Sequence, residues 1–279
     1  MTPTNHKNQT IITPAGLSAF RQIYDVFKNR DLLLTLTWRD LKVRYAQTLL
    51  GFAWSVFQPV FAMASLFIVF FKLAKISTEN IPYLSFTLSG LIFWNYFYFV
   101  IQQSAVGMVA MQAVLKKIYF PRLSIPFSKA LVGLSDWLVA LVILIIVLLW
   151  QDVISAKILW SIPMLLLTMI SALGIGMLIS AFSIRYRDLQ QITPFFLQML
   201  FFITPVAYPS GLLQNMLPKN FDFLVYLNPI SGILELWRHL LFNTTLNPHF
   251  YISIISGSML FIFGLIFFSK TSKKIADIL

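Results

Sequence analysis

Long runs of apolar residues without a single charge alternate along this chain with short stretches that carry several charges. The charge-free runs lie at 45–71, 80–115, 137–151, 158–184, 189–218 and 239–269. Because a helix needs about 20 apolar residues to cross the hydrocarbon of a membrane, most of these runs are long enough for one crossing. The pattern therefore predicts six membrane-spanning helices, at about 49–72, 82–104, 127–150, 158–182, 192–208 and 249–269.

Composition supports this prediction. Of the 279 residues, 58% are hydrophobic, 16% are aromatic and only 11% are charged, whereas soluble domains carry about 25% charged residues. We therefore predict an all-α polytopic membrane protein, with a polar cytoplasmic N-terminus (1–29), one membrane domain (30–271) and a cytoplasmic tail (272–279). The absence of cysteine excludes a disulfide framework and thiolate metal sites.

The distribution of basic residues predicts the orientation. The net charge of +11 comes from residues that lie between the apolar runs rather than on one polar face, which favours a role in topology over nucleic-acid binding. If both termini are cytoplasmic, most lysines and arginines fall on the cytoplasmic side. The basic residues left outside are Lys72, Lys75, Lys157, Lys219 and Arg238. Cytoplasmic loops are enriched in basic residues, so the pattern predicts an even number of spans with both termini inside.

The segment RDLLLTLTWRDLKVRYAQ, residues 30–47, mixes apolar side chains with Trp38, Tyr45 and basic residues. This makeup is typical of an amphipathic helix that lies in the plane of the lipid headgroups. The alternative is a generic interfacial anchor without a protein partner.

Residues 105–126 join the second and third predicted spans on the cytoplasmic side. Their apolar residues recur at helical spacing: Met108, Met111, Val114, Leu115 and Ile118. Phe120-Pro121 ends the pattern. The sequence predicts a short helix whose apolar face fits a groove in a soluble partner. A connector that lies along the membrane is the alternative.

The stretch SIRYRDLQQITP, residues 183–194, holds the compact charged cluster Arg185, Arg187 and Asp188 between the fourth and fifth predicted spans. The cluster fits a second cytoplasmic contact surface. An ordinary cytoplasmic turn explains it equally well.

Residues 209–248 form a long outer segment that is rich in Leu, Phe and Trp and divided by four prolines. The part NPISGILELWRHLLF predicts a helix with Asn228 as its cap and Pro229 at its first position. Glu235 and Arg238 stand three residues apart on this helix and are expected to pair. We interpret the helix as a short re-entrant segment and these four residues as part of an outer gate.

Several chemical motifs are absent from the sequence. It contains no G-x-x-x-x-G-K-[ST] phosphate loop, and its three histidines have no metal-ligand spacing. Asp136 is the only acidic residue within a predicted span, whereas ion-coupled carriers usually hold acids near the midplane. We therefore expect no catalytic site, metal or cofactor in this chain and an external energy source.

Four motifs, in this order, point to a family: RDLKVRYAQTLLGFAWSVFQP, LKKIYFPR, SIRYRDLQQITPFFLQMLFFITPVAYP and LNPISGILELWR. They resemble the membrane subunit of bacterial polysaccharide ATP-binding-cassette exporters, which include the O-antigen, capsule and teichoic-acid permeases. The resemblance covers nearly the whole chain from about residue 20.

The resemblance implies a homodimer in the cytoplasmic membrane, joined to two copies of a separate ATPase that binds ATP and Mg. It implies a long glycan on a lipid such as undecaprenyl diphosphate as the substrate, moved through a channel between the subunits. In this family the in-plane helix and the short helix after the second span contact the ATPase. The coupling residues expected here are Arg39, Asp40, Lys42, Arg44, Lys116, Lys117, Tyr119, Arg122, Arg185, Arg187 and Asp188.

Aromatic residues of the first two spans are candidates for lining the glycan channel, because sugar C–H faces stack on aromatic rings. The candidates are Trp54, Phe57, Gln58 and Phe61 in the first span and Trp94, Tyr96 and Tyr98 in the second. An interfacial aromatic belt or packing against lipid is the alternative. Pro59, which lacks an N–H, predicts a bend near Ser55.

Other functions remain open on the sequence. An exporter of a small lipid or drug is the nearest alternative within the class. A membrane-embedded glycosyl or acyl transferase would need an acidic or histidine pair that faces a cavity, and the sequence shows no such pair.

Overall fold

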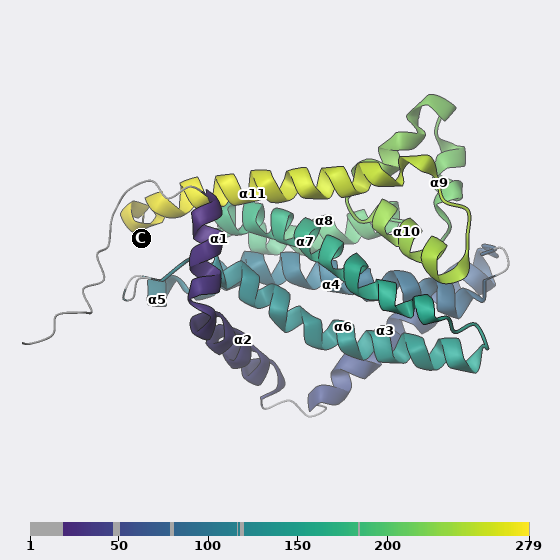
Figure 1. Ribbon diagram of the computed structural model, residues 1–279, viewed down its shortest axis with the longest axis horizontal. Helices are drawn as coiled ribbons and strands as arrows, with labels where there is room; N and C mark the ends of the chain where they lie inside the picture. The colour runs from purple at the N-terminus through teal and green to yellow at the C-terminus, as the bar shows by residue number, and fades with distance from the viewer. Residues whose placement is uncertain are drawn as a thin grey trace, which may run out of the picture.

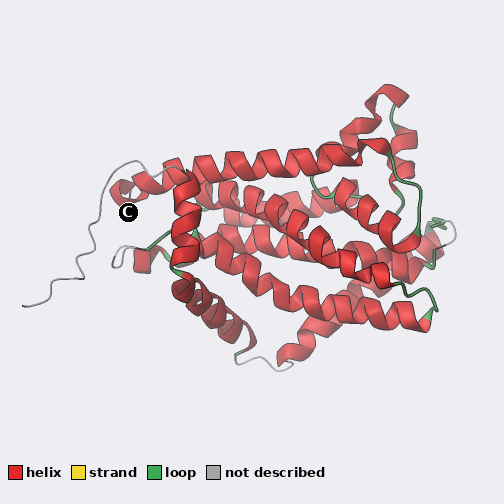
Figure 2. Ribbon diagram, in the orientation of Figure 1, coloured by secondary structure: helices red, strands yellow, loops and turns green. Residues whose placement is uncertain are grey.

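The computed structural model describes residues 19–46, 51–78, 81–115, 117, 120–183 and 185–278, and this part of the chain contains no strand (Figure 2). The α-helices are α1 (Ala19–Lys28), α2 (Arg30–Tyr45), α3 (Trp54–Leu66), α4 (Tyr83–Ala110), α5 (Gln112–Leu115), α6 (Ser124–Trp150), α7 (Ser161–Ser183), α8 (Leu189–Ile203), α9 (Ser210–Met216), α10 (Ser231–Phe242) and α11 (Tyr251–Ile278). Short helical turns are η1 (Gly51–Ala53), η3 (Ala156–Trp160), η4 (Lys219–Leu227) and η5 (Pro248–Phe250), and a π-helical stretch, η2 (Phe67–Leu73), extends α3. The predicted all-α class is confirmed.

Five helical stretches of the described chain are long and apolar enough to cross a membrane: Gly51–Leu73, Tyr83–Ala110, Ser124–Trp150, Ala156–Ser183 and Pro248–Ser272. The span predicted at 192–208 differs from the structure. There α8 is a shorter apolar helix that ends at Ile203, and Thr204 beyond it is extended, with a ψ of 132°. Pro205 explains this end, because a proline disfavours the helical conformation for the residue before it.

The central helix of the bundle is α4. It packs mainly against α6 and α7 and also contacts α3 and α8, and 78% of its most apolar stretch is buried. By contrast, only 6% of the corresponding stretch of α3 and η2 is buried. Figure 1 shows α3 at the edge of the bundle. The rest of the described chain therefore leaves α3 almost uncovered.

The two ends of the bundle carry different elements. In Figure 1, α1, α2, α5 and the end of α11 lie on the left, and α9 and α10 lie on the right. Residues 30–47 are predicted as a helix, and α2 fills Arg30–Tyr45 of this range and packs against α6. Residues 1–29 are predicted as a polar lead-in, but Ala19–Lys28 form α1. Val26 is fully buried there, so α1 belongs to the folded domain.

The connection after the second span also differs from the prediction. α4 runs on to Ala110, and α5 is a single turn. Met108 and Met111, which were expected to face a soluble partner, are buried in the core with 0% and 6% of their surface exposed. Their apolar spacing therefore continues the buried face of α4. Ile118 lies outside the described residues.

The first span changes its helix type later than Pro59. α3 continues through Pro59 to Leu66, and the π-helical hydrogen-bond pattern begins at Phe67. Pro59 itself is buried. The π-helical hydrogen bonds of this span thus lie in the half that follows Pro59.

α7 and α11 touch through glycines. A Cβ atom built on Gly174 would lie 2.6 Å from the backbone nitrogen of Phe261 and 2.7 Å from the carbonyl carbon of Leu260. A Cβ on Gly264 would collide with the backbone oxygen of Gly174. Small residues at such contacts let membrane helices approach closely and gain van der Waals contact.

Gly174→Ala is therefore expected to push α7 from α11 and to lower stability by about 1–3 kcal/mol, the usual cost of overpacking. Thermal unfolding of the purified protein in detergent measures this effect. Gly211→Ala is the matched control, because a Cβ at Gly211 meets no atom within 4 Å. Equal melting temperatures for the two variants would contradict the close contact.

Candidate functional site

Two ion pairs join α2 to α6. Lys129 Nζ lies 2.6 Å from Asp40 Oδ2, and Arg44 Nη2 lies 2.6 Å from Asp136 Oδ2. The side chains of Lys129 and Asp40 are only 12% and 13% exposed. Charged side chains within a membrane bundle pair with one another because hydrocarbon cannot solvate them. These two pairs therefore hold α2 against α6.

Asp136 also connects to the first span. Its Oδ1 accepts hydrogen bonds from Ser55 Oγ at 3.1 Å and from the Tyr45 hydroxyl at 3.3 Å. The guanidinium of Arg44 lies 4.7 Å from the centroid of the Phe99 ring on α4. A single carboxylate thus links α2, α3 and α6, with α4 beside them.

These contacts correct two of the sequence-based assignments. Asp40 and Arg44 were expected on a surface for a soluble partner, but their charged atoms are bound to α6. Arg39 is also partly engaged: it donates to Asp40 and, at 3.1 Å, to the sulfur of Met111. The inward contacts explain why charges sit so close to an apolar span.

Other charged candidates remain on the surface at this end of the bundle. The exposed ones are Arg39, Lys42, Lys117, Arg185, Arg187 and Asp188. Lys42 lies 5.3 Å from the centroid of the Trp38 ring, and Arg185 lies 5.4 Å from that of Tyr186. Arg122 is partly buried and has contacts of its own. Lys116 and Tyr119 lie outside the described residues.

The aromatic stripe of α3 faces outward from the protomer. Trp54, Phe57 and Phe61 are 55%, 42% and 61% exposed, and Gln58 beside them is exposed as well. The rings of Phe57 and Phe61 stack with their centroids 6.0 Å apart. α8 also presents aromatic residues, including Phe195 with 68% exposed.

A shallow hollow of about 350 Å³ lies between α4 and α8. It is lined by Trp94, Tyr98, Pro194, Leu197, Gln198, Phe201 and Phe202. Tyr96, by contrast, is 2% exposed, and its hydroxyl donates to the Ala130 carbonyl of α6 at 3.0 Å. Trp94 and Tyr98 therefore border a surface hollow, whereas Tyr96 is a packing residue of the interior. This corrects its assignment to the channel.

At the end of the bundle that carries α9 and α10, Asn228 and Pro229 both lie before α10. Asn228 is therefore not its cap, and Pro229 is not its first residue. The helix begins at Ser231, and Pro229 is buried in the preceding turn. The side chain of Asn228 accepts a hydrogen bond from the backbone of Ile230 and donates to Thr204 Oγ1 at 2.7 Å. Asn228 thus fastens the start of α10 to the end of α8.

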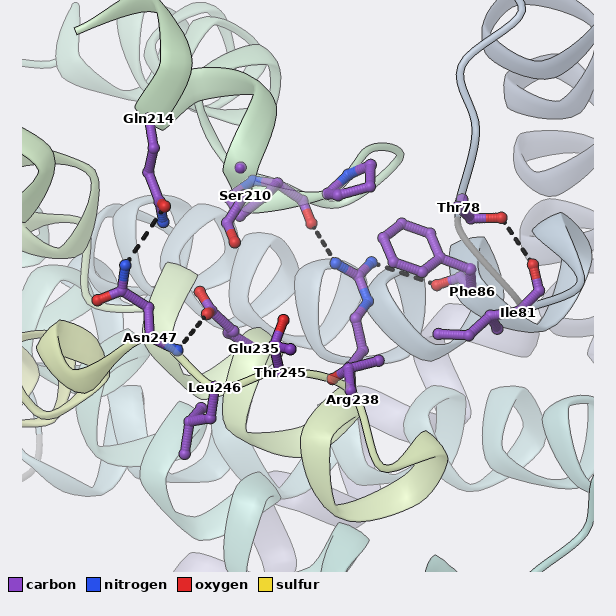
Figure 3. Close-up of a pocket in the computed structure, with 14 residues that line it drawn as sticks. Thr78, Ile81, Phe86, Ser210, Gln214, Glu235, Arg238, Thr245, Leu246 and Asn247 are labelled. Carbon is purple, nitrogen blue, oxygen red and sulfur yellow. Dashed lines mark hydrogen bonds between the residues drawn. The ribbon is translucent and has the colours of Figure 1, made fainter.

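Arg238 is buried and binds backbone carbonyls instead of Glu235. Its three side-chain nitrogens donate to the carbonyls of Pro205, Val206 and Phe86 and to Ser89 Oγ. Its guanidinium lies 3.6 Å from the centroid of the Phe86 ring (Figure 3). The predicted Glu235–Arg238 pair is therefore wrong. Arg238 satisfies carbonyls that the non-helical segment after α8 leaves without helical partners.

Glu235 belongs to a closed ring of hydrogen bonds. It accepts from the Tyr226 hydroxyl and, at 2.9 Å, from the backbone N–H of Asn247. Gln214 donates to Tyr226 at 2.7 Å and accepts from the Asn247 amide at 3.3 Å. Burial and the Glu235 carboxylate raise the pKa of Tyr226, so the phenol keeps its proton and donates. The ring ties α9, η4 and α10 to the segment that follows α10.

Comparison with known proteins identifies the family. The sequence profile described as ABC-2 type transporter matches residues 31–242. This chain belongs to the ABC-2 type transporter family. It is 33% identical over 255 residues to an O-antigen export system permease protein RfbA of Klebsiella pneumoniae, an alignment that covers 89% of this chain and 95% of that protein.

More distant similarities agree. An O-antigen export system permease protein RfbA of Myxococcus xanthus is 24% identical over 263 residues, covering 91% of this chain and 97% of that protein. The polysialic acid transport protein KpsM of Escherichia coli is 22% identical over 208 residues, covering 72% and 77%.

The sequence patterns of this ABC-2 transporter did not reveal several of the side chains that bind Asp136 and Asp40. Ser55, Tyr45 and Lys129 were not assigned to the Asp136 and Asp40 clusters. One signal was present in the spacing of the charges. Asp40 and Arg44 stand one turn apart on one helix, and their partners Lys129 and Asp136 stand two turns apart on another. No comparable spacing signals the ring around Glu235, because its members come from four separate segments.

Breaking one ion pair of this ABC-2 transporter leaves a nearly buried charge without its partner. Asp40→Asn is expected to lower stability by about 2–4 kcal/mol, because Lys129 then remains charged in a poorly solvated place. The double variant Asp40→Asn, Lys129→Met is expected to be more stable than Asp40→Asn alone. Thermal unfolding in detergent measures both, with the exposed Asp188→Asn as control. If the loss of stability in the double variant equals the sum of the losses in the two single variants, the two side chains are not coupled.

Proposed function

We propose that this chain is the membrane subunit of an ATP-driven exporter that moves a lipid-linked polysaccharide across the bacterial cytoplasmic membrane. The similarity to O-antigen permeases over nearly the full length of both chains carries the proposal. The uncovered aromatic surfaces on α3 and α8 support it, because such rings offer broad faces to sugar C–H groups. The polysaccharide is of the O-antigen, capsule or teichoic-acid type.

ATP is bound and hydrolysed, with Mg, by a separate ATPase subunit, because this sequence has no phosphate loop. Two copies of the ATPase dock at the end that carries α1, α2 and α5, which faces the cytoplasm. The exposed charges there, on α2, after α5 and between α7 and α8, form the docking surface. A displacement of α2 then reaches α6 through the two ion pairs and reaches α3 through Asp136 and Ser55.

Two permease chains form the path for the glycan. α3 is almost uncovered in one protomer, and α8 exposes several large apolar side chains. A second copy that faces these helices completes an aromatic-lined passage. Sugars stack on its rings without directional bonds to each unit, which allows a long chain to slide.

Deleting the gene in its own bacterium is expected to remove the surface polysaccharide and to accumulate lipid-linked polysaccharide inside the cell. Extraction of glycolipids and immunoblotting of the cell surface measure both. Reintroducing the gene restores export. Normal surface polysaccharide in the deletion strain would contradict the proposed function, and accumulation of a small lipid would favour an exporter of that lipid.

Charge reversal at the docking surface is expected to weaken ATPase binding. The variant Lys117→Glu, Arg187→Glu should reduce co-purification of the ATPase several-fold, because opposite charges at an interface steer and hold partners. The control Lys75→Glu changes an exposed basic residue at the opposite end of the bundle. Equal ATPase yields in all three proteins would remove this surface from the interface.

Loss of the aromatic stripe is expected to slow export without unfolding the protein. Phe57→Ala with Phe61→Ala removes two stacked and exposed rings. The matched control is Phe263→Ala on α11, where the ring is 59% exposed. Pulse labelling of surface polysaccharide compares the rates at equal protein levels. If the control slows export as much as the stripe variant, the rings of α3 have no specific role.

A further inference from the structure

A polar cavity lies at the end of the described structure that carries α9 and α10 (Figure 1), away from the aromatic surfaces. It has a volume of about 340 Å³ and lies between the start of α4, the segment 205–211, α10 and the segment 244–247. Figure 3 shows side chains from these elements pointing toward a common space. The volume lies within the range of about 300–1,000 Å³ that is usual for small-ligand pockets.

The cavity wall combines hydroxyl and amide groups with apolar groups. The polar side chains are Thr78, Ser210, Gln214, Thr244, Thr245 and Asn247. Phe86, Ile81 and Leu246 supply apolar surface, together with Pro205 and Pro209. A ligand that fits this wall has many hydroxyl groups and also apolar faces.

The two charged side chains of the wall, Glu235 and Arg238, indicate which class of ligand the cavity favours. All three side-chain nitrogens of Arg238 already donate to backbone carbonyls or to Ser89. Glu235 accepts one hydrogen bond at each carboxylate oxygen, and a carboxylate oxygen has room for a second donor. Four of the five N–H groups of Arg238 are thus engaged within the protein, so the wall offers more acceptors than free cationic donors, which suits hydroxyl groups better than phosphate.

The polar groups are also held in fixed positions before any ligand binds. Gln214, Tyr226, Glu235 and Asn247 orient one another in the ring of hydrogen bonds. Preorganised groups lose little conformational entropy on binding, so they favour recognition.

We propose that this cavity is a binding subsite for a neutral sugar unit of the exported polysaccharide on the outer side of the membrane. The assignment rests on the proposed function. The sugar donates hydroxyl hydrogen bonds to Glu235 and to the amide and hydroxyl groups and lays an apolar face against Leu246. A sugar held there contacts both α9 and α10, the two outer helices.

A glycine on the cavity wall allows a direct test. Gly211 lines the cavity, and a Cβ atom at this position meets no atom within 4 Å, so Gly211→Trp is expected to add bulk at the cavity wall without a clash at Cβ. Met216→Trp is the matched control, because Met216 belongs to the same helix, is 80% exposed and does not line the cavity. Thr245→Val removes one lining hydroxyl while keeping the side-chain shape.

The experiment measures binding of the producing bacterium's own polysaccharide, released from its lipid, to the purified full-length permease by saturation-transfer NMR. We expect wild type and Met216→Trp to bind alike, Gly211→Trp to bind at least tenfold more weakly and Thr245→Val to bind several-fold more weakly. Unchanged melting temperatures establish that the variants are folded. Binding to Gly211→Trp as tight as to wild type, or no binding to wild type, overturns the subsite.

Two further measurements distinguish a sugar subsite from a headgroup subsite and test the subsite separately from the proposed function. Inorganic pyrophosphate added as a competitor represents the headgroup of a lipid diphosphate. If it displaces the polysaccharide, the cavity holds a headgroup and the sugar assignment is overturned; no displacement supports the sugar. Export by the gene-deletion strain tests the proposed function separately, because export can depend on this gene whether or not Gly211→Trp still binds polysaccharide.

Discussion

The structure depends on one constraint: polar groups inside a membrane must find partners within the protein, because hydrocarbon offers none. The described chain meets it with helices, whose backbone groups bond internally. Its few interior charges are also paired: Lys129 with Asp40, and Arg44 with Asp136. Where α8 ends early, Arg238 binds the carbonyls that lose their helical partners. These charged side chains of the apolar bundle are therefore each matched by a specific partner.

The same constraint gives the proposed exporter a mechanical connection. An ion pair in a poorly solvated place is costly to break, so we propose that the two ion pairs make α2 and α6 move together. Asp136 extends this connection to α3 through Ser55. α3 is also the helix with the least cover in one protomer. A force applied to α2 by an ATPase thus arrives at the helix proposed to face the glycan.

The sequence predicted those features that depend on composition along one helix. Charge-free runs located five of the six predicted spans, but the span predicted at 192–208 was wrong at its end, because the effect of Pro205 on the end of α8 was not anticipated. Features that depend on contacts between distant segments were not predictable. The spacing of Met108 and Met111 fits either a face that binds a partner or a face buried in the core. Only the packing of α4 against other helices determines which of the two it is. Glu235 and Arg238 have the spacing of a pair, yet α4 and the segment after α8 provide the partners of Arg238, and Asn247 is a partner of Glu235.

Transport in a purified system tests whether this chain and an ATPase together export polysaccharide. The permease and its ATPase are reconstituted together in vesicles that carry lipid-linked polysaccharide on the ATPase-bearing face, and the polysaccharide that reaches the opposite face is measured. We expect transfer that requires ATP hydrolysis and both subunits. Transfer by the permease without the ATPase, or no transfer when both subunits hydrolyse ATP as a complex, would contradict it.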